Sequence, residues 1–193
     1  MSTDSIRDRI LDATVETLRR HGPAKTGVVD VARALDMSHS NVYKHFASKS
    51  ALFDAVAERW LANVMVPLSK ITADKKTPAP KRLKTWLRTL AETKRKKVLD
   101  DPELFAVYHS ITQDSREVVA AHVSHLLEEV TQILRDGVRE GAWRVSDANK
   151  TAGVILSATS RFHHPAMVAL DEGKTDLKQL DALSDLLIAG LSA

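Results

Sequence analysis

Apolar residues recur at intervals of three and four positions along almost the whole chain, and this feature restricts its fold more than any other. Near the C-terminus, for example, Leu177, Leu180 and Leu187 would share one side of a helix. No segment shows the period-two alternation of a half-buried strand, and no repeat or low-complexity tract is present. The sequence therefore predicts an all-α fold.

Composition narrows the class of protein further. Hydrophobic residues make up 44% of the 193 residues, which is ample for a core, and the absence of cysteine excludes disulfides and thiolate chemistry. The first residues lack an apolar signal segment, and no apolar run approaches the roughly 20 residues that a membrane span needs. We therefore expect a cytoplasmic protein that does not enter a membrane.

The stretch MSHSNVYKHFASK, residues 37–49, combines a turn with two helix starts. Ser38 is a good N-cap, and Val42 and Phe46 are four residues apart, so both would lie on the buried side of a short helix. The opposite side would carry polar residues such as Ser40. Ser48 would cap a further helix and place Lys49 in its first turn, where a lysine can serve a phosphate or can simply be a screened surface residue.

Two helices are expected before this stretch, one over residues 5–21 and a second that Thr26 could cap. Two short helices joined by about three residues form a helix-turn-helix, whose second helix can enter the DNA major groove. We place this domain at residues 1–47, with a connecting helix at about 48–67 and a larger helical domain at 68–193.

Five helices are expected in the larger domain. Their approximate ranges are 81–99, 102–111, 115–141, 146–161 and 176–191. The helix that begins at Ser146 is nearly all apolar or small, which is typical of a helix buried inside the chain or against a second copy of it. Residues 61–100 carry 11 Lys/Arg against 3 Asp/Glu, and a basic front half favours a polyanionic partner.

Residues 21–60 resemble the N-terminal domain of TetR-family transcriptional regulators. The resemblance rests on an ordered set of features: a glycine after the first helix, a capping Thr26, the pair Val31-Ala32, the Ser38 turn, Val42-Tyr43 followed by His45-Phe46, and Ser48-Lys49 followed by Leu52. Two positions depart from the family pattern: Gly27 replaces a polar residue, and Asp36 replaces the turn glycine, although aspartate tolerates the left-handed conformation.

The resemblance implies a homodimeric repressor that binds a double-stranded DNA operator and responds to a small-molecule effector. The last helices of each protomer, at about 146–170 and 176–191, would pack against the same helices of the second protomer and form a four-helix bundle. Phosphate contacts would come from Thr26, Tyr43, His45 and Lys49, and base contacts from His39, Ser40, Asn41 and Lys44 beside the capping Ser38.

Several residues of the larger domain could contact an effector. Arg161, Phe162, His163 and His164 form a polar cluster in the apolar helix, where they could bind a ligand or be satisfied by neighbours near a Pro165 kink. The remaining candidates are aromatic or imidazole side chains, namely Trp86, Phe105, Tyr108, His109 and His122. The aromatic ones are more often core residues than pocket lining. His122 and His125, with His109 on the preceding helix, could converge on a metal ion, although no cysteine or HExxH pattern supports such a site.

No nucleophile motif, phosphate loop or dinucleotide loop occurs, so neither an enzyme nor a cofactor is expected. The alternative to a regulator is an all-α ligand-binding or interaction protein that uses the three-helix unit to dock a partner. A salt-dependent operator contact would separate these two hypotheses.

Overall fold

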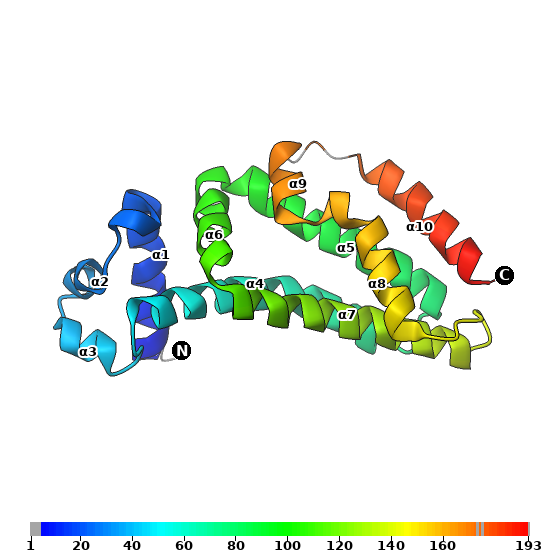
Figure 1. The fold of residues 1–193 in the computed structure, drawn as a ribbon, viewed down its shortest axis with the longest axis horizontal. Helices are drawn as coiled ribbons and strands as arrows, with labels where there is room; N and C mark the ends of the chain where they lie inside the picture. Colours follow the sequence, from blue (N-terminus) through cyan, green and yellow to red (C-terminus); the bar gives the residue numbers. More distant parts are fainter. Residues whose placement is uncertain (1–4, 173, 175, 193) are drawn as a thin grey trace. The chain divides into compact units, whose positions relative to one another are not determined.

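The computed structural model describes residues 5–172, 174 and 176–192, and within these residues it is built from helices alone, as the sequence predicts (Figure 1). The helices are α1 (Ile6–Lys25), α2 (Val28–Ala34), α3 (His39–Tyr43), α4 (Lys49–Ala73), α5 (Ala79–Asp100), α6 (Pro102–Asp114), α7 (Arg116–Arg139), α8 (Ala148–Ala158), α9 (Pro165–Leu170) and α10 (Leu177–Leu191), with a 3-10 turn η1 (Ser160–Phe162) after α8. No described helix is long and apolar enough to cross a membrane.

Contacts divide the chain into two units. The N-terminal unit comprises residues up to Leu61 together with Pro102–Ala120, and the C-terminal unit comprises Ala62–Asp101 and the residues from Ala121 onward. The boundaries expected from the sequence assign α6 to the larger domain, whereas contacts place it in the N-terminal unit. The reason is long-range packing, because α6 lies against α1 and its Tyr108 ring stacks on Trp60, with ring centroids 4.7 Å apart.

The first helix is interrupted where the sequence predicts its end. Gly22 leaves the helical conformation with a φ of 72°, a value that glycine adopts without a steric penalty, and Pro23 follows it. The interruption lets the chain turn toward α2, whose Val28, Val31 and Ala32 are buried. These contacts, with Val42 of α3, form the small core beneath the predicted helix-turn-helix.

The core of the C-terminal unit is a continuous apolar cluster. In α5 the side chains of Leu83, Trp86, Leu87 and Leu90 are at most 1% exposed, and they pack with residues of α4, α7 and α8. In Figure 1, α10 (red) lies along α5 (green), and the contacts between their residues agree with this view.

The predicted helix from Ser146 is shorter than expected. Instead of running to Arg161 and kinking at Pro165, the chain forms α8, the turn η1 and the separate helix α9. The physical reason is that Pro165 is the first residue of α9, where its missing N–H costs nothing, so the proline starts a helix rather than bending one. Part of α8 remains exposed, since Val154 is 57% accessible to solvent.

Candidate functional site

Helix α3 holds its polar side outward, as the sequence predicts. Val42 is fully buried and Phe46 is 4% exposed, so the core fixes the orientation of the helix. The Ser38 hydroxyl caps the helix by accepting a hydrogen bond from the Asn41 N–H at 3.3 Å. The side chains left exposed on this surface are those of His39, Ser40, Tyr43 and Lys44, whereas Asn41 and His45 are half-buried.

The turn before α3 keeps the conformation expected for the family, although Asp36 stands in place of the usual turn glycine. Asp36 adopts a φ of 57°, which is the left-handed conformation that a glycine would take. The Met37 N–H donates to the Ala32 carbonyl at 3.0 Å, and the Asp36 N–H donates to the Arg33 carbonyl at 3.2 Å. The helix-turn-helix therefore closes with an aspartate at the glycine position, as predicted.

Lys49 is exposed at the start of α4. The Ser48 hydroxyl accepts from the Ala51 N–H at 3.0 Å, so Ser48 caps this helix as predicted. The Lys49 ammonium donates to the Pro23 carbonyl at 3.2 Å and lies 5.1 Å from the centre of the Phe53 ring. These contacts hold the cation close to the helix N-terminus, where an anion would also be stabilised.

Thr26 does not have the position that the sequence suggested. The N-cap of α2 is Gly27, whose N–H donates to the Asp30 carboxylate at 2.9 Å, so the prediction that Thr26 caps this helix is wrong. The Thr26 hydroxyl donates backward, to the Gly22 carbonyl at 2.8 Å. Because Thr26 is only 1% exposed, its side chain is not available to a phosphate in this conformation.

Three of the effector candidates belong to the N-terminal unit. Phe105 and Tyr108 pack on Trp60, so their rings are core residues of that unit. His109 is also in this unit, and its buried Nδ1 has no hydrogen-bond partner.

The candidates in the C-terminal unit are not equivalent. Trp86 is fully buried, and its indole N–H donates to Glu129 at 2.8 Å. Arg161 points outward, with its side chain 64% exposed and its Nε 3.7 Å from an oxygen of Asp171. Phe162 packs in a small cluster with Ala91 and Leu180, whereas His122 is buried and His163 is half-buried.

The charge of Lys94 acts on both histidines, and we call these three side chains the basic cluster. Lys94 is 3% exposed and His122 is 8% exposed. Burial, and less strongly the charge of Lys94, lowers the pKa of His122 to about 3 and that of His163 to about 4. Burial, with a smaller effect of Lys97, lowers the pKa of Lys94 to about 8. At neutral pH both histidines are therefore uncharged.

Lys94 is the member of the basic cluster that sequence reasoning did not identify. Its burial is predictable from spacing. Leu83, Leu87, Leu90 and Lys94 follow one another at intervals of four, three and four residues, which places Lys94 on the same side of the helix as the leucines. The run Lys94–Lys97 instead suggests a solvated helix end. Helical periodicity, applied to that run, places its first lysine on the buried stripe.

A second buried polar group contains both acids and bases. We call it the acid–base network, and it is centred on Asp136, which accepts from Arg82 at 2.7 Å, from Lys75 at 2.5 Å and from Gln132 at 2.9 Å. Arg139 also pairs with Asp136, and Glu140 pairs with Arg82 at 3.0 Å. Burial raises the pKa of Asp136, but these hydrogen bonds outweigh it and lower the pKa to about 2.

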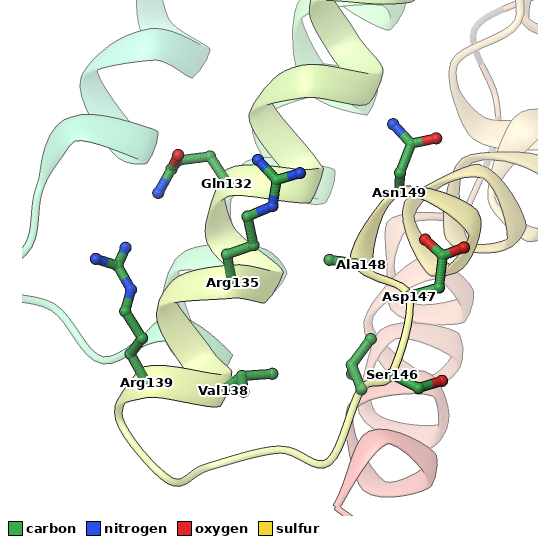
Figure 2. Close-up of a pocket in the computed structure, with 9 residues that line it drawn as sticks. Gln132, Arg135, Val138, Arg139, Ser146, Asp147, Ala148 and Asn149 are labelled. Carbon is green, nitrogen blue, oxygen red and sulfur yellow. The ribbon is translucent and has the colours of Figure 1, made fainter.

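A surface groove of about 720 Å³ lies between α7 and the residues that lead into α8 (Figure 2). Its α7 wall carries Gln132, Arg135 and Arg139. Gln132 and Arg139 are already bound to Asp136, so the α7 wall of the groove borders the acid–base network. Within the described part of the chain, no group of three or more His, Asp or Glu residues is placed to hold a metal ion.

Comparison with known proteins adds independent information on the family. Residues 10–56 match the family described as bacterial regulatory proteins of the tetR family, and residues 79–183 match the tetracyclin repressor-like C-terminal domain. Two curated relatives from strains of Mycobacterium tuberculosis, both described as uncharacterized HTH-type transcriptional regulators, are 31% identical over 104 residues. That match covers 54% of this chain and 49% of each relative, so the chain spans about half the length of the curated relatives it matches.

Solved structures show the same fold. A transcriptional regulator from Pseudomonas aeruginosa PAO1 superposes with a TM-score of 0.74 at 19% identity, covering 99% of this chain and 92% of that one. SmeT, the repressor of the Stenotrophomonas maltophilia multidrug efflux pump SmeDEF, gives 0.71 at 22% identity, with coverages of 97% and 91%. FadR from Bacillus subtilis, solved with stearoyl-CoA, gives 0.66 at 17% identity, with coverages of 96% and 97%.

The two family matches complement the geometry. One covers the helix-turn-helix with its outward-facing α3, and the other covers more than half of the chain, including α5, α7 and α8. The chain therefore belongs to the TetR family of DNA-binding transcriptional regulators.

Proposed function

We propose that this chain is a ligand-responsive repressor that binds a palindromic operator as a homodimer, with α3 in the major groove. The observation that carries the proposal is the outward polar surface of α3, which is fixed from below by the buried Val42 and Phe46. A recognition helix needs this division, because its orientation must be rigid while its side chains reach base edges.

The exposed side chains divide by chemistry into two sets of contacts. His39, Ser40 and Lys44 extend from α3 and would meet base edges, and the half-buried Asn41 would need only its amide to reach an adenine. Tyr43, His45 and Lys49 would bind phosphates and set the register of the helix on the duplex. Thr26 is left out of this set because its side chain is buried.

The DNA contacts can be tested on the DNA that flanks the protein's own gene. A footprint would define the operator, and binding would then be measured against salt concentration for Lys49→Ala and Lys44→Ala. We expect Lys44→Ala to weaken operator binding by about 1–3 kcal/mol, and Lys49→Ala, which removes a cation from a phosphate, to reduce the salt slope by about one. Lys70→Ala is the matched control, since Lys70 is an exposed lysine of the C-terminal unit.

Wild-type affinity and salt slope in both variants would contradict the assignment of α3 as the recognition helix. A loss of the same size in Lys70→Ala would show only a general charge effect. Neither residue is buried, so both variants are expected to fold.

The homodimer is supported by apolar side chains left in solvent on the last helices. Leu186 of α10 is 72% exposed and Val154 of α8 is 57% exposed. We expect light scattering to give a mass near twice the 21.3 kDa of the chain, and Leu186→Glu to shift the mass toward the monomer. Leu99→Glu, at an exposed leucine of α5, is the control. A wild-type mass of one chain at working concentration would refute the dimer.

The response to a ligand is supported by the family and by relatives solved with small molecules. SmeT has been solved as a complex with triclosan, and FadR from Bacillus subtilis with stearoyl-CoA. For this chain, an effector that prefers a spacing of recognition helices unsuited to half-sites about 34 Å apart would weaken DNA binding, and DNA would weaken effector binding by the same factor.

A further inference from the structure

Helix α3 is too short to keep its position by its own hydrogen bonds. It has five residues, whereas isolated helices of fewer than about 12–15 residues are only marginally stable in water. The Ser38 hydroxyl caps its N-terminal end, and the buried Val42 anchors its lower side. Whether the C-terminal end is also held decides how well the whole helix is ordered before it meets DNA.

Arg7 of α1 holds the C-terminal end of α3, although it lies 38 positions earlier in the sequence. Its Nη1 donates to the His45 carbonyl at 3.1 Å, two residues after α3 ends. Its guanidinium carbon lies over the Phe46 ring, 4.4 Å from the ring centre. We call this pair of contacts the Arg7 tie, because one side chain joins both the backbone and the ring that follow α3 to α1.

The position of the guanidinium suits its charge and its shape. The last carbonyl groups of a helix lack partners within the helix and carry partial negative charge, which a cation stabilises. After α3, the Val42 carbonyl accepts from the N–H groups of His45 and Phe46, each at 3.0 Å, and the His45 carbonyl accepts from Arg7. A planar guanidinium can donate to a carbonyl and stack on a ring at the same time, whereas a lysine ammonium is a point charge that lacks this geometry.

The Arg7 tie lies directly beside the proposed DNA contacts. Tyr43, Lys44 and His45 are three of those contacts, and the tie holds the backbone of the last of them. Arg7, His45 and Phe46 belong to the same unit of the structure. Arg7 itself is exposed, so its replacement leaves no cavity in the core and the unit is expected to fold without it.

From these contacts we propose that Arg7 is a positioning residue for operator recognition, which holds the end of α3 in the conformation that binds DNA. This inference rests on the proposal that α3 is the recognition helix. Ordering a binding element in advance lowers the entropy that binding costs. The loss of the tie therefore weakens the complex with the operator, in which side chains must meet base edges, more than a non-specific complex, in which phosphate contacts suffice.

The DNA test compares the full-length wild type with Arg7→Met, Arg7→Lys and Arg9→Met. Arg9 is the matched control, because it is an exposed arginine on roughly the opposite side of α1 and its replacement removes the same charge. Fluorescence anisotropy would measure the affinity for the footprinted operator and for a scrambled duplex of the same length. The ratio of the two affinities reports specificity, and a general loss of charge or of folded protein changes both affinities together.

We expect Arg7→Met to lower the ratio of operator to scrambled affinity about tenfold, the combined scale of one hydrogen bond and one exposed cation–π contact. Arg7→Lys keeps the charge and can keep only one of the two contacts, so its ratio should be intermediate. Arg9→Met should keep the wild-type ratio. The salt slope should be the same in Arg7→Met and Arg9→Met, because the tie acts on the protein and not on a phosphate.

Amide hydrogen exchange gives a second readout that requires no DNA. Mass spectrometry would follow exchange in peptides that cover residues 39–46 of the free protein. We expect exchange there to be about tenfold faster in Arg7→Met and unchanged in Arg9→Met, because exchange reports local opening of the segment that has lost its support. Peptides from α5 should exchange as in the wild type, which verifies that the rest of the chain stays folded.

Either of two results would overturn the inference. One is wild-type exchange in residues 39–46 of Arg7→Met. The other is an unchanged ratio of operator to scrambled affinity in that variant. A salt slope lowered by about one in Arg7→Met alone, with Arg7→Lys like the wild type, would make Arg7 a phosphate contact and would also overturn the positioning role.

Lys44→Ala separates this inference from the proposed function. Operator binding that depends on Lys44 but not on Arg7 would refute the positioning role and leave the repressor standing. Faster exchange in Arg7→Met, in a protein whose DNA binding does not depend on Lys44, would refute α3 as the recognition helix and would support Arg7 as the residue that orders its end.

Discussion

The acid–base network and the basic cluster lie in the same unit and are buried to a similar degree, yet they treat charge in opposite ways. Asp136 is surrounded by Arg82, Lys75 and Arg139, so each ion has a partner of opposite sign. His122 is surrounded by Lys94 and His163, and it stays neutral. The difference indicates that ion pairs join the helices in the first group, whereas burial and a neighbouring cation keep the imidazoles of the second group neutral.

The shifts of pKa express the same contrast. Burial opposes ionisation in both groups, but hydrogen bonds from Lys75 and Arg82 overcome it at Asp136 and keep that carboxylate charged. In the basic cluster the charge of Lys94 adds to the effect of burial, so the histidines lose their protons. Four substitutions or conditions can break or sharpen this comparison.

The largest effect is expected from Arg82→Met. Arg82 is 1% exposed and bridges Asp136 and Glu140, so its loss leaves buried carboxylate charge with fewer partners. We expect the free energy of unfolding to fall by about 3 kcal/mol, measured by urea denaturation. Arg88→Met, at an arginine that pairs with Glu92 and Asp181 nearer the surface, should cost clearly less, and equal losses would refute a special role for the network.

Gly137→Ala tests whether packing beside Asp136 matters as much as charge. A Cβ at this position would lie 2.1 Å from the Trp143 ring, so the indole or α7 must move. We expect a loss of about 2 kcal/mol in the free energy of unfolding, from overpacking alone. The control is Gly153→Ala in α8, where a Cβ meets no atom within 4 Å and the change should be neutral or stabilising.

Acid should weaken the two regions in different pH ranges. Unfolded histidine takes up a proton near pH 6.5, whereas His122 and His163 resist protonation until about pH 3 and 4. The contribution of the neutral histidines is therefore fully present well above pH 6.5 and falls as the pH drops through 6.5, by about 2 kcal/mol per histidine at pH 5. The contribution of Asp136 is lost only between its ordinary pKa of 3.8 and about 2.

Urea denaturation at a series of pH values would measure both ranges. His122→Gln should reduce the loss between pH 6.5 and 4, and His21→Gln, at an exposed position of the N-terminal unit, should leave the profile unchanged. A profile that is flat in this range for the wild type would contradict the neutral state of the buried histidines.

The smallest effect, and one of opposite sign, is expected from His122→Leu. The substitution removes a buried nitrogen that has no partner and replaces it with an apolar group. We expect the free energy of unfolding to stay the same or rise by up to about 1 kcal/mol. Destabilisation comparable to that of Arg82→Met would mean that the basic cluster is structural, like the network.

The helix-turn-helix was predictable because its signals are local. The spacing of Val42 and Phe46, the caps at Ser38 and Ser48, and the tolerance of Asp36 for the left-handed conformation all act within a few residues. The cap of α2 was missed because Gly27 has no side chain, and its N–H is satisfied instead by Asp30. Thr26, which lies one position before Gly27 and is buried, is a residue type that often caps helices, so the sequence alone favours it over glycine.

The C-terminal unit was less predictable because its polar groups meet over long distances in sequence. Arg82 and Asp136 are partners across two helices, and nothing in the sequence around either residue specifies the other. The basic cluster joins α5, α7 and the segment after η1 in the same way. From the sequence, helical periodicity could place only Lys94 on the buried side of its helix, and the lysines that follow it suggest a solvated helix end instead.

The three tryptophans provide a spectroscopic consequence of this architecture. Trp60 stacks on a tyrosine ring in the N-terminal unit, Trp86 donates its indole proton to a glutamate, and Trp143 covers a glycine with its own indole nitrogen unsatisfied. Variants that retain one tryptophan each would emit from distinct surroundings. Their fluorescence would reveal which unit melts first.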